Sequence, residues 1–484
     1  MFARHYLSLA LAITCGYSGL TRGQTPSSGQ LALHDGDVVV FCGDELTEAP
    51  DPRRSATFPV LVETFLTVRY PNLHVRYHNA GWAGDSATRV GLRLERDVLT
   101  HKPTVVVICL GMNDPQYRPF GEEPRLLETF RDELARIVKR CQAAGARVWL
   151  ISPPSVKETR GQTTRVQRDG KPFFVDLATL SYNKTLVQYT AAIKQIAEEN
   201  DTGFVDWFDA MTAACRENRP DQNDFYAQRE TRLPQTRGHA LVAAKLLEAW
   251  NVTPIRATIE FDWKRGSAKV EVADDELHPA SAAVIITNDG QRIFEVEGLP
   301  LPWPVPETRT SGLQPYWEAT RLCQITFKMS DPPERGIKLA REATDAGTKD
   351  NAIITAAELK SGFNLAAIKA VRSSKEVQDL LKLVQLKNMY RYGIWRRLEL
   401  VPAEEPELAE PQKQLIRAWE GYATGYEKII ARHPKTFAAK LTLAEATPGE
   451  QLPTSQPSKQ RRPRTSRQSR RMTPPPKTTS PTPK

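Results

Sequence analysis

The feature that most constrains this chain is an alternation, over its first half, of short apolar runs with longer amphipathic segments. Residues 38–42 and 105–110 are almost wholly apolar, as expected for strands buried on both faces of a sheet. Further strands are expected at 73–78, 147–152 and 203–206, and helices at 55–69, 86–99, 124–144, 177–200 and 238–250. This alternation predicts an α/β fold, in which a parallel sheet has helices on both faces in a three-layer arrangement.

The pattern changes after residue 253. Short strand patterns, at 258–261, 268–272, 283–287 and 324–328, alternate with Pro and Gly, and the Pro-rich run 300–306 excludes a helix or a central strand there. Two helical patterns follow, at 376–390 and 410–432, and predict a helical hairpin packed on the main domain. We therefore divide the chain into an N-terminal segment (1–23), an α/β domain (35–250), a small β-rich region (253–365), a helical region (366–445) and a tail (446–484).

The positive charge of the chain is confined to its tail. The formal net charge is +9, yet residues 451–484 contain nine Lys or Arg and no acidic residue, so the remainder carries 57 basic and 57 acidic side chains. A tail rich in Pro, Ser, Thr and Arg has little to bury and is predicted to be disordered. Its cations favour contact with an anionic polymer or membrane surface, although a solvated extension without a partner fits equally well. Specific nucleic-acid binding is not expected.

The first residues resemble a secretory signal peptide. A basic start is followed by a short apolar run that is too short to span a bilayer, and cleavage is expected between Ser18 and Gln24. We therefore expect an exported protein that is periplasmic, secreted or bound to the cell surface. The five cysteines after Cys15 are odd in number and have no CxxC spacing, so we expect neither a zinc site nor a disulfide framework. We also expect no cofactor.

Polar motifs follow the apolar runs, and loops that leave the carboxyl ends of parallel strands gather into one site. The first motif is 43–46 (Gly-Asp-Glu-Leu), the second is 79–85 (Asn-Ala-Gly-Trp-Ala-Gly-Asp) and the third is 110–114 (Leu-Gly-Met-Asn-Asp). The fourth, 230–239 (Glu-Thr-Arg-Leu-Pro-Gln-Thr-Arg-Gly-His), leads into the last helix of the domain.

In this order the four motifs resemble those of the GDSL/SGNH hydrolases, and the resemblance covers residues 35–250. It implies an oxyanion hole, formed by the backbone N–H of residue 45, the backbone N–H of Gly84 and the side-chain amide of Asn113. Asp44 and Asp114 would lie in the same pocket. Residues 358–366 and 387–397 are also similar to segments that follow this domain in large exported bacterial proteins.

The catalytic residues of the family are absent from the matching positions. The resemblance implies a serine nucleophile and an Asp-x-x-His pair, but Glu45 takes the place of the serine, Glu230 that of the aspartate and Leu233 that of the histidine. Leucine cannot accept a proton, and a carboxylate is a poor substitute for an activated hydroxyl. Loss of a serine-hydrolase triad removes about six orders of magnitude in rate. The sequence therefore predicts a catalytically degenerate protein that binds an acylated or carbohydrate ligand, or a partner, in the former pocket.

An active carbohydrate or lipid esterase with a rearranged site is the alternative. Thr47, Ser86 or His239 could then take over catalysis, but Ser86 is expected to cap a helix and His239 to point elsewhere. Glu45 and Glu230 could act as a carboxylate pair of the glycosidase kind, although two solvated acids are the simpler interpretation. For Glu45 itself we expect either a carboxylate that fills the oxyanion hole as a built-in anion, or a side chain that points to solvent and leaves the hole to water.

Overall fold

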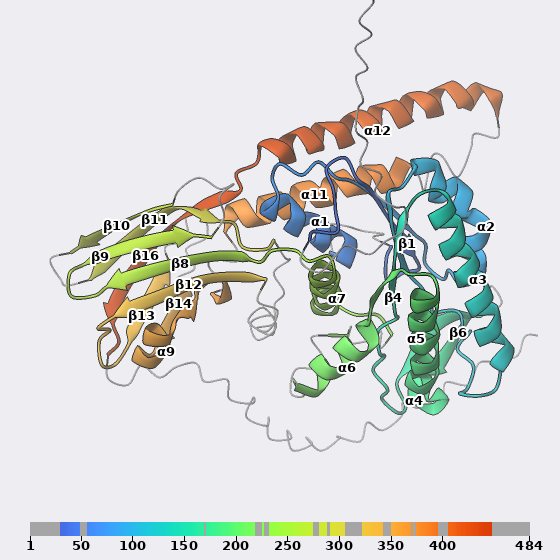
Figure 1. Cartoon of the computed structure of the whole chain (residues 1–484), viewed down its shortest axis with the longest axis horizontal. Coiled ribbons are helices and arrows are strands. Elements are labelled where there is room, and N and C mark those ends of the chain that lie inside the picture. Colours follow the sequence, from blue (N-terminus) through green and yellow to red (C-terminus); the bar gives the residue numbers. More distant parts are fainter. Residues whose placement is uncertain are drawn as a thin grey trace, which may run out of the picture.

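The computed structural model describes residues 30–48, 56–168, 171–217, 225–226, 232–273, 280–287, 291–304, 322–341, 350–368, 371, 374–394 and 405–447. Along these ranges an α/β domain is followed by a β-sandwich and a pair of long helices (Figure 1). The expected signal segment, and the tail from residue 448 onward, lie outside them. No helix in the described part of the chain is both long and apolar enough to cross a bilayer.

The predicted parallel sheet is confirmed. Its five strands are β1 (Val38–Gly43), β2 (Arg76–Gly81), β3 (Val105–Cys109), β4 (Arg147–Ile151) and β7 (Gly203–Val205). They run parallel in the order β2-β1-β3-β4-β7, so β1 lies between β2 and β3. The loops that follow these three strands therefore meet at one edge of the sheet.

Helices cover both faces of the sheet because side chains along each strand point alternately to either side. Val39 and Phe41 of β1 pack with α1 (Phe58–Arg69) and α7 (Thr236–Ala249). Val40 and Cys42 pack on the opposite face, with a second set of helices. This second set consists of α2 (Ala87–Asp97), α3 (Pro124–Ala143) and α5 (Tyr182–Glu199).

Three parts of the α/β domain differ from the sequence-based expectation. The segment expected to be a loop, 155–172, contains a hairpin strand, β5 (Thr163–Arg168), which pairs with β6 (Lys171–Asp176). The helix expected at 177–200 is divided into α4 (Leu177–Leu180) and α5, because Ser181 adopts a left-handed conformation with φ 51°. Helix α6 (Trp207–Glu217) was not predicted.

The β-rich region forms two sheets that pack face to face. The five-stranded sheet has the order β10 (Ser281–Ile286), β11 (Arg292–Pro300), β16 (Thr436–Glu445), β13 (Ile337–Arg341) and β14 (Asp350–Ile354). The four-stranded sheet has the order β15 (Phe363–Asn364), β12 (Cys323–Ser330), β8 (Ile255–Asp262) and β9 (Ser267–Val272). Phe261, Phe294 and Phe327 fill the core between them, with ring centroids 5.8 to 5.9 Å apart. The short helix α9 (Ala356–Ser361) lies beside β12.

Strand β16 lies within the range 366–445, which the sequence analysis expected to be helical. Its buried residues alternate with exposed or half-buried ones, and this two-residue period fits a strand rather than a helix. It pairs with β11 and β13, so the chain returns to the sandwich after the helices.

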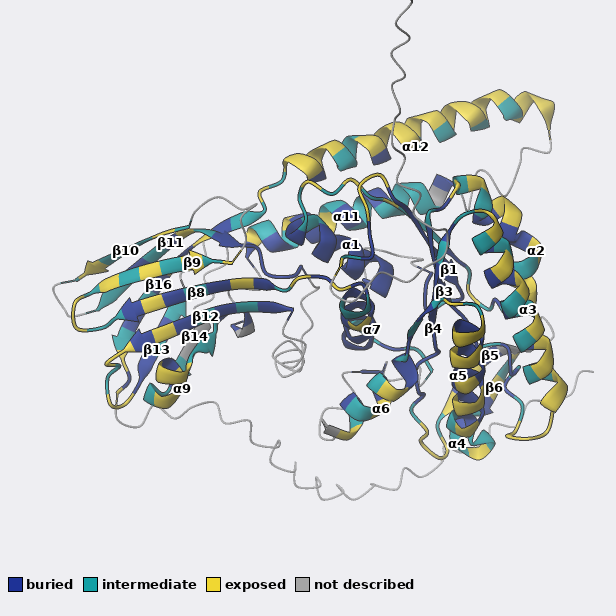
Figure 2. Cartoon of the chain, viewed as in Figure 1, coloured by how far each residue is buried: buried dark blue, intermediate teal, exposed yellow. Residues whose placement is uncertain are grey.

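The two long helices are α11 (Lys375–Gly393) and α12 (Pro406–Arg432). Helix α11 packs on α1 and β2 of the α/β domain, where Lys387 forms a buried ion pair with Glu63. Helix α12 packs along α11 and forms the outermost layer, and most of its surface is exposed (Figure 2).

Candidate functional site

The turn after β1 presents Glu45 at the edge of the sheet. A side chain at Gly43 would place its Cβ only 2.3 Å from the carbonyl oxygen of Cys109, so the close approach of β1 and β3 requires glycine here. The Asp44 carboxylate then accepts a hydrogen bond from Leu46 N (2.9 Å), which closes the turn. This compact turn fixes the position from which the side chain of Glu45 extends.

The carboxylate of Glu45 is held by three groups. Its Oε2 accepts hydrogen bonds from Gly84 N (2.7 Å) and from Asn113 Nδ2 (2.9 Å). Its Oε1 forms an ion pair with the guanidinium of Arg232. The side chain of Glu45 is only 10% exposed. Of the two placements expected for Glu45, the structure therefore shows the one in which the carboxylate lies among the donors and not in solvent.

The two neutral donors are fixed by their own loops. Gly84 has φ +79°, a left-handed conformation that glycine adopts without strain. Asn113 accepts a hydrogen bond at Oδ1 from the hydroxyl of Tyr117 (2.6 Å), which turns its amide N–H groups toward Glu45. Tyr117 stacks in turn on Tyr182, with ring centroids 5.0 Å apart. Both donors are thus oriented independently of Glu45.

Arg232 was not identified from the sequence. Its guanidinium lies against the ring of Tyr117 and donates to the Tyr117 hydroxyl (3.3 Å) while it pairs with Glu45. Burial lowers the pKa of Arg232 to about 10, so this side chain remains a cation at neutral pH. No sequence pattern marks Arg232. The one general indication was that a carboxylate shielded from solvent by the surrounding loops needs a cation nearby.

Asp44 and Asp114 support the loops around Glu45. Asp114 accepts hydrogen bonds from Ala87 N (2.7 Å) and Gly111 N (3.0 Å), and so joins the loops after β2 and β3. Burial raises the pKa of Asp114 to about 7 and that of Asp44 to about 8. Both carboxyl groups are buried and already engaged with backbone N–H groups.

Of the other two positions of the expected triad, Leu233 lies within the described residues and brings no catalytic group to Glu45. Leu233 is half-buried and packs against the hydrophobic core of the domain. Glu230 lies outside the described residues. The structure therefore gives no placement for a second carboxylate opposite Glu45.

The residues considered as substitutes for the catalytic set have structural roles. Ser86 caps α2, where its hydroxyl accepts from Arg89 N (3.5 Å) as predicted. Thr47 is fully buried. His239 is buried in α7 with its ring 5.6 Å from that of Trp207, and burial lowers the pKa of this histidine to about 4.

Within the described ranges, no group of three or more His, Cys, Asp or Glu side chains is arranged to hold a metal ion. The five cysteines found there are all free thiols.

Comparison with known proteins agrees with this geometry. Residues 41–241 match the model of the GDSL-like lipase/acylhydrolase family. A curated relative, an acetylxylan esterase from Geobacillus stearothermophilus, is 26% identical over 248 residues, which is 49% of this chain and 99% of the relative. The α/β domain is thus similar to the GDSL/SGNH hydrolases over residues 41–241, as the sequence motifs indicated.

Solved structures that align with the chain include the following two. A gut microbial diltiazem-metabolizing enzyme aligns with a TM-score of 0.58 at 17% identity, over 87% of this chain and 100% of its own, and so shares the fold well beyond the α/β domain. The structure of the Geobacillus stearothermophilus acetylxylan esterase aligns with a TM-score of 0.37 at 24% identity, over 46% of this chain and 98% of its own.

Proposed function

We propose that this protein is a catalytically inactive member of its family, in which the carboxylate of Glu45 takes the place of the oxyanion. The observation that carries the proposal is the pair of hydrogen bonds to Glu45 Oε2 from Gly84 N and Asn113 Nδ2. In an ester hydrolase, donors of this kind stabilise the negative charge that develops on the carbonyl oxygen of the substrate. A built-in carboxylate occupies those donors and repels a second negative charge.

The groups around Glu45 support the same proposal. Catalysis by the family mechanism requires a hydroxyl that a base can activate. Thr47 is buried and Ser86 caps a helix. Leu233, at the position of the family's histidine, has no group that could accept a proton.

The function that remains for such a domain is binding. We propose that the former pocket binds an acylated or carbohydrate ligand, or a protein partner, without cleaving it. Glu45 and Arg232 are 10% and 12% exposed, so a polar ligand at the domain surface could reach this pair. The name of the curated relative, an acetylxylan esterase, makes acetylated carbohydrates the first ligands to test.

An active esterase with a rearranged site is the second candidate, and one observation favours it. The pKa of Asp44 is raised to about 8 by burial, and its Oδ2 lies 3.4 Å from Asn113 Nδ2. Acids with raised pKa values are frequent in active sites. However, Asp44 is fully buried and its Oδ1 is engaged with Leu46 N, which favours a structural role.

Hydrolysis of p-nitrophenyl acetate, measured beside labelling with a serine-directed fluorophosphonate, distinguishes the two candidates. We expect no enzyme-dependent hydrolysis and no labelled serine in the native chain. The triple variant Glu45→Ser, Glu230→Asp, Leu233→His should gain weak activity and a label at position 45, which provides a positive control. A stoichiometric adduct on any native serine, lost together with activity when that serine is changed to alanine, would establish the rearranged esterase.

We also propose that the protein is exported and that its basic tail contacts an anionic polymer or membrane surface. Intact-mass analysis of protein recovered outside the cytoplasm should show loss of about the first 23 residues, and retention of Met1 would contradict export. Truncation after Thr447 should weaken salt-sensitive retention on an anionic polymer. Unchanged retention would contradict the role of the tail.

A further inference from the structure

Helix α12 carries a regular apolar stripe on its exposed surface. Leu408, Leu415, Tyr422 and Ile429 recur every seven residues and are 56%, 42%, 58% and 51% exposed. A seven-residue repeat places side chains on one side of a helix after every two turns, which is the spacing used by paired helices. Large apolar side chains are seldom exposed in so regular a row.

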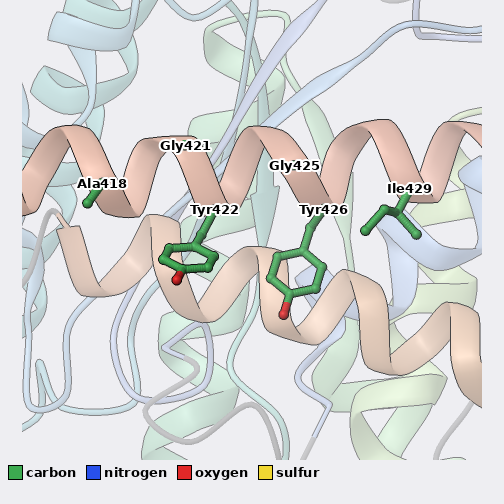
Figure 3. Close-up of a pocket in the computed structure, with 6 residues that line it drawn as sticks. All are labelled: Ala418, Gly421, Tyr422, Gly425, Tyr426 and Ile429. Carbon is green, nitrogen blue, oxygen red and sulfur yellow. The ribbon is translucent and has the colours of Figure 1, made fainter.

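A groove runs along this stripe. Its volume is about 430 Å³ and it is lined by Ala418, Gly421, Tyr422, Gly425, Tyr426 and Ile429. Figure 3 shows Tyr422 and Tyr426 directed toward α11, beneath the two glycines of α12. A Cβ added at Gly421 or Gly425 would meet no atom within 4 Å. Since glycine weakens a helix relative to alanine, these two glycines have no purpose that the described part of this chain explains.

The stripe borders the contact between α12 and α11, because Tyr422 of the stripe and its neighbour Tyr426 both stack on Tyr390 of α11. On the inner side of α12, Ala423 and Ile430 are buried, and Trp419 contacts the ring of Tyr390 at 6.0 Å. Tyr422 lies at the boundary, because its ring stacks on Tyr390 at 5.0 Å yet remains 58% exposed. Within the described part of the chain, Leu408, Leu415 and Ile429 therefore stay exposed beside an apolar face of α12 that is already partnered.

We infer that the open face of α12 binds the same face of a second copy of this chain, with the two helices antiparallel. Charge favours this occupant. The first turns of α12 carry Glu405, Glu407 and Glu410. Its last turns carry Lys428 and Arg432, while the carboxylate of Glu427 there pairs with Arg391 of α11. An antiparallel pair places each acidic end beside the basic end of the other helix, and the opposed helix dipoles add to this attraction.

The apolar stripe also fits a two-fold axis between two antiparallel copies of α12. When Leu408 lies opposite Ile429 of the partner subunit, Leu415 lies opposite Tyr422 of the partner subunit. In this register the acidic end of each helix also lies beside the basic end of the other. A two-fold axis near Ala418 thus makes one patch complementary to itself. Ala418, Gly421 and Gly425 allow the two backbones to approach closely, and each large side chain can enter the space beside them.

Sedimentation of the full chain over a wide range of concentrations tests the inference. We expect a reversible monomer–dimer equilibrium, because the contact is confined to one helix face. Leu415→Glu should weaken the dimer about tenfold or more, as the loss of a buried apolar contact does. Gly425→Leu should also abolish dimerisation while it leaves the melting temperature unchanged or higher, since the site has free space and leucine favours the helix.

Thr424→Glu is the matched control, because Thr424 is exposed on α12 but lies outside the stripe. This variant should dimerise like the native chain. A chain that stays monomeric at every concentration, or a dimer that tolerates both Leu415→Glu and Gly425→Leu, would overturn the inference.

Charge reversal tests the antiparallel orientation. Glu407→Lys alone and Lys428→Glu alone should each weaken the dimer, and the two changes in one chain should restore it. In a parallel pair each residue would face its own copy in the other helix. Like charges would therefore face each other both before and after each reversal. A dimer indifferent to the single reversals would therefore contradict the antiparallel arrangement.

Discussion

Two glutamates of the α/β domain, the partly exposed Glu45 and the buried Glu63, each pair with a cation, but they lie in different settings. Glu63, on α1, pairs with Lys387 and accepts a hydrogen bond from Asn388 Nδ2 (2.9 Å), and both partners belong to α11. The partners of Glu45 all belong to its own domain. The side chains of Glu63 and Lys387 are 6% and 3% exposed, against 10% and 12% for Glu45 and Arg232.

The two carboxylates differ in the origin of the groups that bind them. Glu63 joins two regions of the chain, so its cation comes from the region that docks there. Glu45 occupies two donors that already have their own supports, at Gly84 and through the Tyr117 hydroxyl on Asn113. Glu63 is thus part of an interface, whereas we propose that Glu45 stands where a ligand atom would otherwise bind. Removal of either carboxylate should expose this difference.

The largest effect is expected at the interface. Lys387→Met leaves the charge of Glu63 buried beside Asn388 alone, and breaking a buried pair in this way costs about 3–5 kcal/mol. Denaturant unfolding should report this loss, and hydrogen exchange should show that α11 opens. The double variant Glu63→Met, Lys387→Met should recover most of the stability because no charge remains buried. Equal losses in the single and double variants would show that the ion pair is not what holds α11.

A smaller effect is expected at the former oxyanion site. Glu45→Gln keeps the size of the side chain but removes the charge that Gly84 N, Asn113 Nδ2 and Arg232 recognise. The loss of a charge-assisted hydrogen bond should cost about 1 kcal/mol or more in the free energy of unfolding. The exposed residue Glu95, changed to Gln, provides the control and should be neutral. A neutral Glu45→Gln would contradict the account of the filled site.

The third effect concerns pH. Burial raises the pKa of folded Asp44 to about 8, whereas an unfolded aspartate titrates near about 4. Between these values the folded state binds more protons, so the contribution of Asp44 to stability falls as pH rises from about 4 through about 8. Asp44→Asn stays neutral and should make the decline between about pH 6 and pH 9 shallower.

The exposed Asp35 provides the control for the pH prediction. Hydrogen bonds from His74 lower the pKa of Asp35, so its titration lies at acid pH. Asp35→Asn should therefore leave the slope between neutral and alkaline pH unchanged. An unchanged slope in Asp44→Asn would contradict the proposed titration of Asp44.

Much of the α/β domain could be predicted because its signals are local. The apolar runs marked the strands, and the motif at 110–114 marked Asn113 as a donor. The hairpin β5–β6 was missed although Asp-Gly at 169–170 is the turn pair that type I′ hairpins prefer. The period of two in β16 was likewise visible in the sequence.

The partners of the two glutamates could not be predicted, for a physical reason. Arg232 lies 187 positions after Glu45 along the chain, and Lys387 lies 324 positions after Glu63. Residues so far apart in the sequence produce no periodic pattern that would link them. Each cation is brought to its carboxylate only by the folding of the chain. The sequence defined two possible placements for Glu45, and the choice between them depended on Arg232.

The most direct test of the central claim is the response of Glu45→Ala to added acetate. If the carboxylate of Glu45 fills the site, its removal leaves Gly84 N, Asn113 Nδ2 and Arg232 ready to bind an external carboxylate. Thermal unfolding should then show a saturable stabilisation of Glu45→Ala by sodium acetate over sodium chloride. The native chain should show none, because its site is already occupied, and neither should Glu63→Ala, whose Lys387 is buried. Equal responses in the native chain and Glu45→Ala, or no response in a folded Glu45→Ala, would contradict the account.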